Sequence, residues 1–189
     1  MAGCLVNVPA TTRQARVAFR ATPEAEARLL LLIDAFSRKR NGQRTLEGRV
    51  KLAKLDFLLR YPAYAARLLA HAGAPQHDID AVAQEANPLE QRMVRYRYGP
   101  WDPAYYALLG SLIGRGLVEV VPLARGFGYR TTARGQQLAV ALVADDSHAL
   151  VAQRTSLLRK WLDKQGSTLK NWVYDAIPEV SEAEWHTPL

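Results

Sequence analysis

Apolar positions recur at helical spacing over much of the chain, and the first such run is well delimited. Leu29, Ile33 and Phe36 share one helical face, and Thr22 followed by Pro23 supplies a capping hydroxyl and a proline at the first helical position. The pattern predicts a helix that begins at Thr22 and ends in the basic segment that follows it.

A second helix is expected over residues 45–60. Its apolar positions, which include Val50 and Phe57, fall on one face, whereas Lys51 and Lys54 fall on another, which we interpret as solvated. Pro62 breaks this helix, because proline disfavours the helical conformation in the residue before it. Two shorter helical segments follow, at 64–71 and around 79–86.

The pattern changes to strands and turns after residue 91. Residues 92–98 alternate as in a short strand, Gly99-Pro100 turns the chain, and Asp102-Pro103 begins a helix that ends at 114–116. The β-branched run 117–121 and the segment 129–132 then flank a glycine-bearing turn, which predicts a β-hairpin.

Helical spacing returns after the hairpin. Thr132 is expected to cap a long helix that reaches residue 162, with an interruption around 145–147. Ser167 is expected to cap a last helix, which Pro178 ends, and residues 181–189 show no pattern.

The segment from the third helix through the hairpin resembles winged-helix regulators. LLGSLIGRGLVEV (108–120) and GFGYRTTARG (126–135) match their pattern of docking leucines, a helix-ending glycine, a wing and a following helix start. The predicted fold is therefore mainly α with a small β-hairpin (α+β), a winged helix flanked by N- and C-terminal helices. The expected parts are an N-terminal arm (1–21), a helical part (22–90), the winged helix (91–142) and C-terminal helices with a tail (143–189).

Composition and charge limit the kinds of partner and the cellular location that we expect. The net charge is +7, and the excess lies in residues 1–60, which hold twelve Lys and Arg against five Asp and Glu. This favours a polyanion or an acidic protein face, although solubility alone is the competing interpretation. Cys4 is the only cysteine, and no apolar run approaches the roughly 20 residues of a membrane span. We expect a cytoplasmic protein without a signal peptide and without a membrane partner.

The predicted third helix is poor in groups that read bases. Its expected apolar face holds Tyr105, Leu108, Leu109, Leu112 and Ile113, and the other face carries small residues that suit close packing by a protein. The aromatic and basic residues just before it could stack bases or simply pack. The partner-binding candidates are Ala104, Ala107, Gly110, Ser111, Tyr98 and Trp101.

Contact with the DNA backbone remains open through arginines and lysines of the first loop, the third-helix end, the hairpin and the following helix. Ordinary solvated side chains are the alternative interpretation. These nucleic-acid-binding candidates are Arg38, Lys39, Arg40, Arg44, Arg115, Arg125, Arg130 and Arg134.

No pattern indicates catalysis. The sequence has no phosphate-binding glycine loop and no nucleophile motif, and His77-Asp78-Ile79-Asp80 lacks the spacing of metal ligands. We expect no enzyme, no cofactor and no metal.

KLDFLLRYP (54–62), YRYGPWDP (96–103) and the LKNWVY…IPEV ending (169–180) resemble the middle components of bacterial ABC-three-component systems, found in anti-phage and mobile-element loci. The resemblance implies an adaptor between an ABC- or SMC-like ATPase and an effector. The alternative is a transcriptional regulator that forms a homodimer through residues 136–162 and binds duplex DNA.

Overall fold

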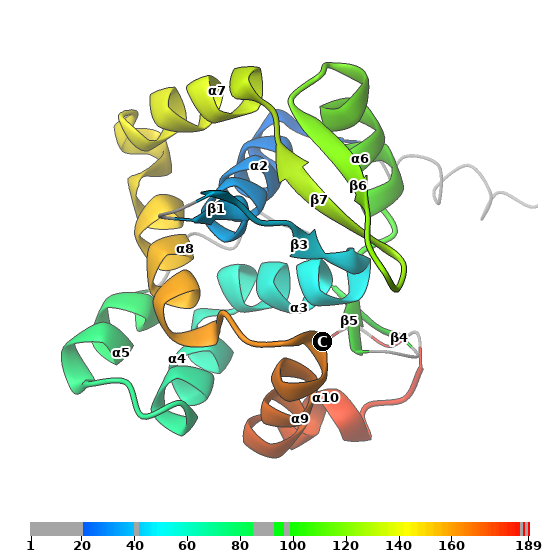
Figure 1. Ribbon diagram of the computed structural model, residues 1–189. Helices are drawn as coiled ribbons and strands as arrows, with labels where there is room; N and C mark the ends of the chain where they lie inside the picture. Colours follow the sequence, from blue (N-terminus) through cyan, green and yellow to red (C-terminus); the bar gives the residue numbers. More distant parts are fainter. Residues whose placement is uncertain (1–20, 40–41, 85–92, 97–98, 186, 188) are drawn as a thin grey trace, which may run out of the picture.

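The computed structural model describes residues 21–39, 42–84, 93–96, 99–185, 187 and 189; Arg40 and Tyr98 therefore lie outside the described residues. The described chain is mainly helical and carries small antiparallel sheets (Figure 1). Its helices are α2 (Pro23–Ser37), α3 (Gly48–Arg60), α4 (Pro62–His71), α5 (Gln76–Ala83), α6 (Tyr105–Gly114), α7 (Ala133–Val143), the 3-10 helix η1 (Asp146–His148), α8 (Ala149–Leu162), α9 (Gly166–Ala176) and α10 (Pro178–Glu182). Its strands are β1 (Arg38–Lys39), β2 (Gly42–Gln43), β3 (Leu46–Glu47), β4 (Val94–Tyr96), β5 (Gly99–Trp101), β6 (Val118–Pro122) and β7 (Phe127–Thr131).

The central element is α2, and both predicted start signals are confirmed. The Thr22 hydroxyl accepts a hydrogen bond from the Ala25 N–H at 3.2 Å, and Pro23 occupies the first turn. The helix contacts α3, α6, α7, α8 and β7, so its aliphatic run Leu29–Ile33 is buried all round. A helix buried on every side has no polar face, which accounts for its nearly continuous apolar stretch.

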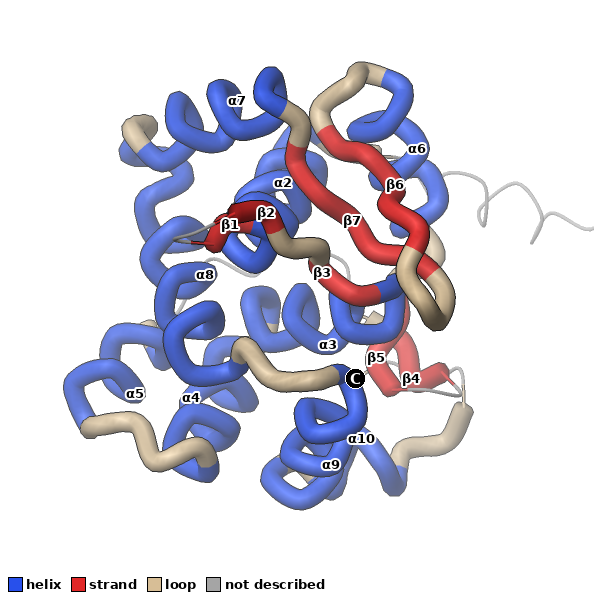
Figure 2. The backbone as a smooth tube through the Cα atoms, in the orientation of Figure 1, coloured by secondary structure: helices blue, strands red, loops and turns tan. Residues whose placement is uncertain are grey.

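A three-stranded antiparallel sheet in the described part of the chain covers α2 on one side, in the order β3-β7-β6 (Figure 2). Leu46 of β3 pairs with Tyr129 of β7, and Val120 of β6 pairs with Tyr129 from the other side. The prediction of helix at residues 45–47 is therefore wrong. Gly48, at a positive φ of 64°, provides the turn from β3 into α3.

Gly99-Pro100 is a strand rather than a turn. In β5 it pairs antiparallel with β4, with Val94 opposite Trp101 and Tyr96 opposite Gly99. The C-terminal segment, predicted to be without order, also contacts β4: the N–H of Arg95 donates to the Thr187 carbonyl and the N–H of Leu189 to that of Met93, each at 2.8 Å.

The face of α3 predicted to be solvated is in fact buried. Lys51 pairs with Asp163 at 3.7 Å, and Lys54 packs against Gly99 of β5 with only 2% of its surface exposed. Val50, predicted for the apolar face, is exposed instead. The helix lies between α2, α4, α8, α9 and β5, so partners on both sides decide its burial.

Downstream of the hairpin the predicted boundaries hold closely. Thr132 caps α7 by accepting from the Gly135 N–H at 3.1 Å, and Asp145 interrupts the helical run by accepting from the Ser147 N–H at 2.9 Å. Helix α9 begins at Gly166, so Ser167 lies inside it rather than capping it, and α9 ends just before Pro178 as expected.

Candidate functional site

The outward face of α6 is small and apolar. Tyr106, Ala107, Gly110, Ile113 and Gly114 are exposed on it, and we call these residues the α6 face. The opposite side, with Tyr105, Leu108, Leu109 and Leu112, is buried as predicted. A Cβ built at Gly110 or Gly114 meets no atom within 4 Å, so neither glycine is required by packing within the described chain.

Two residues are not where the sequence suggested. Ala104 precedes the first turn of α6 and is buried, so this predicted partner-binding residue is not on the surface. Ile113, predicted for the core, is exposed near the C-terminal end of α6. Ala107 and Gly110 are exposed and Ser111 is half-buried, which agrees with their predicted accessibility.

An aromatic groove adjoins the N-terminal end of the α6 face. It holds about 410 Å³ and lies between the first turns of α3, the β4–β5 hairpin and the start of α6. Its lining, which we call the aromatic groove, is Arg49, Val50, Ala53, Val94, Tyr96, Gly99, Pro100, Trp101, Pro103 and Tyr106.

Three rings form a row along this groove. Trp101 lies in the middle, with its ring centroid 6.1 Å from that of Tyr96 and 6.0 Å from that of Tyr106. The ring planes are inclined by 33° and 62° respectively. Tyr96 is 43% exposed and Tyr106 is 64% exposed, which is unusual for side chains with so much apolar area. Of the predicted partner-binding residues, the structure places Trp101 here.

Arg49 is the charged residue of the groove lining. Its guanidinium lies over the Tyr106 ring, 5.0 Å from the centroid, and over the Phe127 ring at 5.6 Å. No carboxylate among the described residues lies within ion-pair distance of it. Cation–π contacts thus hold this side chain in place while its N–H donors stay available.

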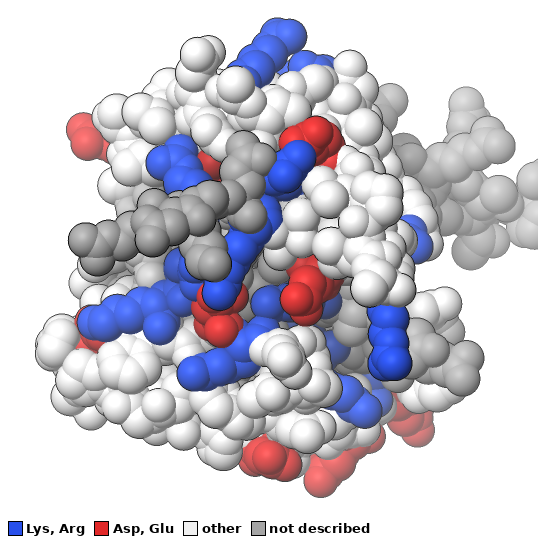
Figure 3. Space-filling model, in the orientation of Figure 1, with Lys and Arg blue, Asp and Glu red and all other residues white. Residues whose placement is uncertain are grey.

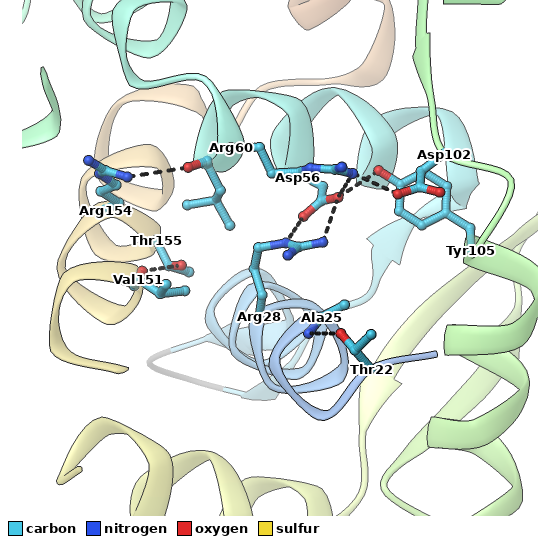
Figure 4. A network of polar contacts seen from close by, with 11 residues as sticks. Thr22, Ala25, Arg28, Asp56, Arg60, Asp102, Tyr105, Val151, Arg154 and Thr155 are labelled. Atoms are coloured by element: carbon cyan, nitrogen blue, oxygen red, sulfur yellow. Dashed lines mark hydrogen bonds and ion pairs between the residues drawn. The ribbon is translucent and has the colours of Figure 1, made fainter. Parts of the chain in front are cut away.

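A buried polar network fixes α6 against α3 and α2 behind the groove (Figure 4). Asp56 accepts from Arg28 at 2.5 Å and from the Tyr105 hydroxyl at 2.7 Å, and Arg60 donates to Asp102 at 2.7 Å. Asp102 in turn accepts from the Ala104 N–H at 2.8 Å in the turn before α6, so the helix begins at Tyr105 rather than at Asp102-Pro103 as predicted.

The burial and pairing of these side chains indicate a structural role for the network. Asp56 and Tyr105 are fully buried, and the Asp56 carboxylate is neutralised by Arg28, with Arg60 3.8 Å away. Burial, reinforced by the neighbouring Asp56, raises the pKa of Tyr105 well above its ordinary value, so its hydroxyl stays a hydrogen-bond donor. The network therefore fixes the wall of the groove that carries Trp101 and Tyr106.

Four of the eight predicted nucleic-acid-binding residues are paired with carboxylates. Arg38 contacts Asp34 at 2.7 Å, Arg44 contacts Asp163 at 2.5 Å, Arg115 contacts Glu26 at 2.5 Å and Arg130 contacts Glu119 at 2.7 Å. Lys39 lies in β1. Arg125 and Arg134 are exposed, and neither contacts a carboxylate of the described residues.

Figure 3 shows the consequence for one face of the molecule. Lysine and arginine side chains form a band across it, and aspartate and glutamate side chains are interspersed along that band. The basic residues at 38 and 44 and those at 125 and 134 also come from different elements, near β1 and β3 on one side and around the β6–β7 turn and α7 on the other. The structure does not gather them into one unpaired cationic surface.

The His77–Asp80 segment has a structural use. Asp78 accepts from Lys160 and from the Trp161 ring N–H, both at 2.7 Å, and so ties α5 to α8. No group of three or more metal-ligating side chains occurs within the described ranges. Among the helices that the structure describes, none has the length and apolar character needed to cross a bilayer.

Sequence reasoning missed Arg49, Val50 and the groove itself. Arg49 sits in a segment predicted as an ordinary helix, and its stacking depends on Phe127, almost eighty residues later in the chain. The dense cluster of aromatic residues around Trp101 was the signal that pointed to this region.

No protein family, curated protein or solved structure matches the chain.

Proposed function

We propose that the protein is a non-enzymatic winged-helix adaptor that binds protein partners within a bacterial multi-protein assembly. The observation that carries this proposal is the α6 face, which offers glycine, alanine and exposed apolar side chains where a DNA reader offers hydrogen-bonding groups. Its small residues Ala107, Gly110 and Gly114 let a partner's backbone approach closely, and its exposed Tyr106 supplies apolar contact area.

The order of the elements supports the winged-helix part of the proposal. In this assignment α2, β3, α3, α6 and the β6–β7 hairpin are the three helices, the small strand and the wing, and α6 is the helix in the recognition position. The winged helix then begins at α2 rather than near residue 91, and the segment 61–104 is an insertion between its second and third helices. That insertion carries Trp101 and Tyr96 to the α6 face.

The resemblance to middle components of ABC-three-component systems supports an ATPase and an effector as the partners. An adaptor needs binding surfaces and no catalytic centre. The α6 face and the aromatic groove supply such surfaces side by side, sharing Tyr106.

Duplex DNA is a second candidate partner, favoured by the exposed Arg125 at the β6–β7 turn and by Arg134 in the first turn of α7. These residues suit phosphate contact rather than base reading. A dimeric regulator would in addition need a self-complementary surface, for which the exposed Val140 and Val143 of α7 are candidates.

The test is co-purification with the products of neighbouring genes, comparing the wild type with Gly110→Glu. The added side chain meets no atom within 4 Å of its Cβ, so the fold is expected to persist while the flat surface is lost. Ala63→Glu, an exposed small residue on α4, is the matched control. Loss of a partner in Gly110→Glu alone supports the adaptor. A wild-type protein that purifies alone and monomeric contradicts it.

The second candidate, binding to duplex DNA, is tested by measuring the affinity for a labelled random duplex at increasing salt concentration. Binding that falls steeply with salt and is weakened by Arg125→Ala and Arg134→Ala supports contact with the DNA backbone. Arg38→Ala, which removes an arginine already paired with Asp34, is the control. No binding at low salt removes DNA from the proposal.

A further inference from the structure

The side chains that line the aromatic groove indicate which kind of ligand it binds. Its lining is apolar and aromatic apart from Arg49, and its opening exposes Tyr96, Tyr106 and Val50. A monomeric protein rarely leaves such a group of large apolar side chains in contact with water unless something binds there.

The row of rings is too tightly spaced to accept nucleobases between its members. A base sandwiched between two rings needs roughly 6.8 Å between parallel planes, twice the 3.4 Å stacking distance. Here the Trp101 centroid lies 6.0 and 6.1 Å from its neighbours, and the planes are inclined by 62° and 33°. The rings therefore contact one another by edges and tilted faces, and Tyr96 and Tyr106 are exposed at the groove.

A groove lined by tilted, exposed aromatic rings suits the packing of pyrrolidine rings. Proline-rich segments bind aromatic-lined grooves in the polyproline II conformation, whose low entropy reduces the cost of binding. The row from Tyr96 to Tyr106 extends at most about 12 Å, enough for roughly four residues at the polyproline II rise of 3.1 Å.

The electrostatics of the groove favour a negatively charged ligand. Arg49 is held over Tyr106 and Phe127 and pairs with no carboxylate of the described residues. Arg95, on the buried side of β4 and outside the groove lining, donates to the Tyr96 carbonyl and to the Ser181 carbonyl at 3.5 Å, and its Nε has no acceptor among the described residues. The buried acids behind the groove, Asp56 and Asp102, are already bound to Arg28 and Arg60.

We propose that the aromatic groove binds an extended segment of a partner protein that contains prolines and a carboxylate side chain. The prolines pack on Tyr96, Trp101 and Tyr106, and the carboxylate pairs with Arg49, whose fork of donors suits bidentate contact. This inference rests on the proposed adaptor function, because it names the kind of partner that one of the two surfaces binds.

The experiment measures binding of a fluorescein-labelled peptide of four Pro-Pro-Glu repeats to the full chain by fluorescence anisotropy. A Gly-Ser-Glu peptide of equal length and charge tests the need for proline, and a Pro-Pro-Lys peptide tests the sign of the charge. Labelled oligo-dT, a flexible single strand, tests the nucleic-acid alternative.

The variants are Arg49→Gln and Tyr106→Ala, each expected to weaken the Pro-Pro-Glu peptide about tenfold, since each removes one principal contact. Tyr106 is largely exposed, so its loss does not threaten the fold. Arg67→Gln is the matched control, because Arg67 also lies over a tyrosine ring, at 5.7 Å, but outside the groove. It is expected to bind like the wild type.

The proposal is overturned by no binding of the Pro-Pro-Glu peptide, by equal binding of the Gly-Ser-Glu or the Pro-Pro-Lys peptide, or by binding that survives both groove variants. Preferential binding of oligo-dT that both variants abolish also overturns it and assigns the groove to nucleic acid. The adaptor function is tested separately, since Gly110 lies outside the groove lining. If Gly110→Glu loses its partners but the groove does not bind proline peptides, the adaptor function is supported and the proline-containing ligand is rejected.

Discussion

At the scale of single residues, Asp56 connects the three helices α2, α3 and α6. It lies on α3, accepts from Arg28 of α2 and from Tyr105 of α6, and is fully buried. A buried carboxylate with these partners adds little net stability over an apolar replacement of the whole group. Removing it alone, however, leaves a buried guanidinium without its counter-charge.

Asp56→Asn is therefore expected to lower the free energy of unfolding by about 3–5 kcal/mol, as measured by urea denaturation. The control is Glu179→Gln, which breaks an ion pair with Arg67 on the exposed surface and should change stability little. Equal effects of the two substitutions would contradict a buried ionic anchor.

Lys54 shows what the sequence leaves undetermined about a single side chain. Its helical position predicted solvent, but the β4–β5 hairpin covers it. Burial, with repulsion from Lys170 and Arg95, lowers the pKa of Lys54 to about 8. By contrast, the caps at Thr22 and Thr132 were predictable, because capping depends on neighbours within three residues.

The lowered pKa makes stability depend on pH in a definite direction. Below about pH 8 the amine is charged in both states, so the cost of burying it is fully present. Between about pH 8 and 10.5 the unfolded chain keeps the proton and the folded chain loses it, so the free energy of unfolding rises with pH. We expect the wild type to gain stability relative to Lys54→Met as pH rises from 7.5 to 9.5 in urea titrations. Lys164→Met, at an exposed position, should keep the wild-type profile, and a parallel profile for Lys54→Met would contradict the prediction.

At the scale of elements, the join between the hairpin and α7 depends on one glycine. A Cβ at Gly135 would lie 2.0 Å from the Leu117 carbonyl oxygen, so the first turn of α7 can lie against the start of the β6 segment only without a side chain there. This explains the glycine after the Thr-Thr-Ala-Arg sequence in physical terms.

Gly135→Ala is expected to destabilise the protein by about 1–3 kcal/mol, because backbone rather than a flexible side chain must move. Gly110→Ala, within α6 and in open space, should raise stability by roughly 0.5–1 kcal/mol through helix propensity. Thermal unfolding of both variants checks the opposite signs, and a shift in the same direction for both would refute the explanation.

The elements that the sequence failed to predict are the shortest ones. Strands β3 and β5 have two and three residues, too few for an alternating pattern to emerge. Leu46 joins a sheet only because Tyr129 of β7 offers a free edge far along the chain. The hairpin β6–β7 carries its own turn, with Gly126 at a positive φ, and was predicted correctly in type and nearly in extent.

At the scale of the whole molecule, the predicted divisions do not correspond to separate cores. One apolar cluster joins α2, α3, α6 and the C-terminal helices, and β3 completes the sheet begun by the hairpin. The candidate site also depends on contacts between distant segments. Trp101 could be identified from the local sequence, whereas the position of Arg49 depends on Phe127 of β7, which lies beside it only in the folded chain.

An isolated fragment of residues 91–142 is accordingly expected not to fold. It would expose the faces of Leu108, Leu112 and Tyr129 that α2 and β3 cover in the full chain. Circular dichroism and amide chemical-shift dispersion, compared with the full chain, provide the measurement. A fragment that melts cooperatively would show that this segment is self-sufficient.

The central position of α2 has a consequence for the protein during its synthesis. Its aliphatic run leaves the ribosome well before most of its partners do: α3 follows soon, but β7 comes about 90 residues later and α8 later still. At roughly 5–20 residues per second, β7 is synthesised on the order of 5–20 seconds after that run, which stays incompletely buried during this time. The nascent chain is then a natural client for chaperones that hold exposed aliphatic segments, and slowing elongation between α2 and β7 should increase aggregation rather than relieve it.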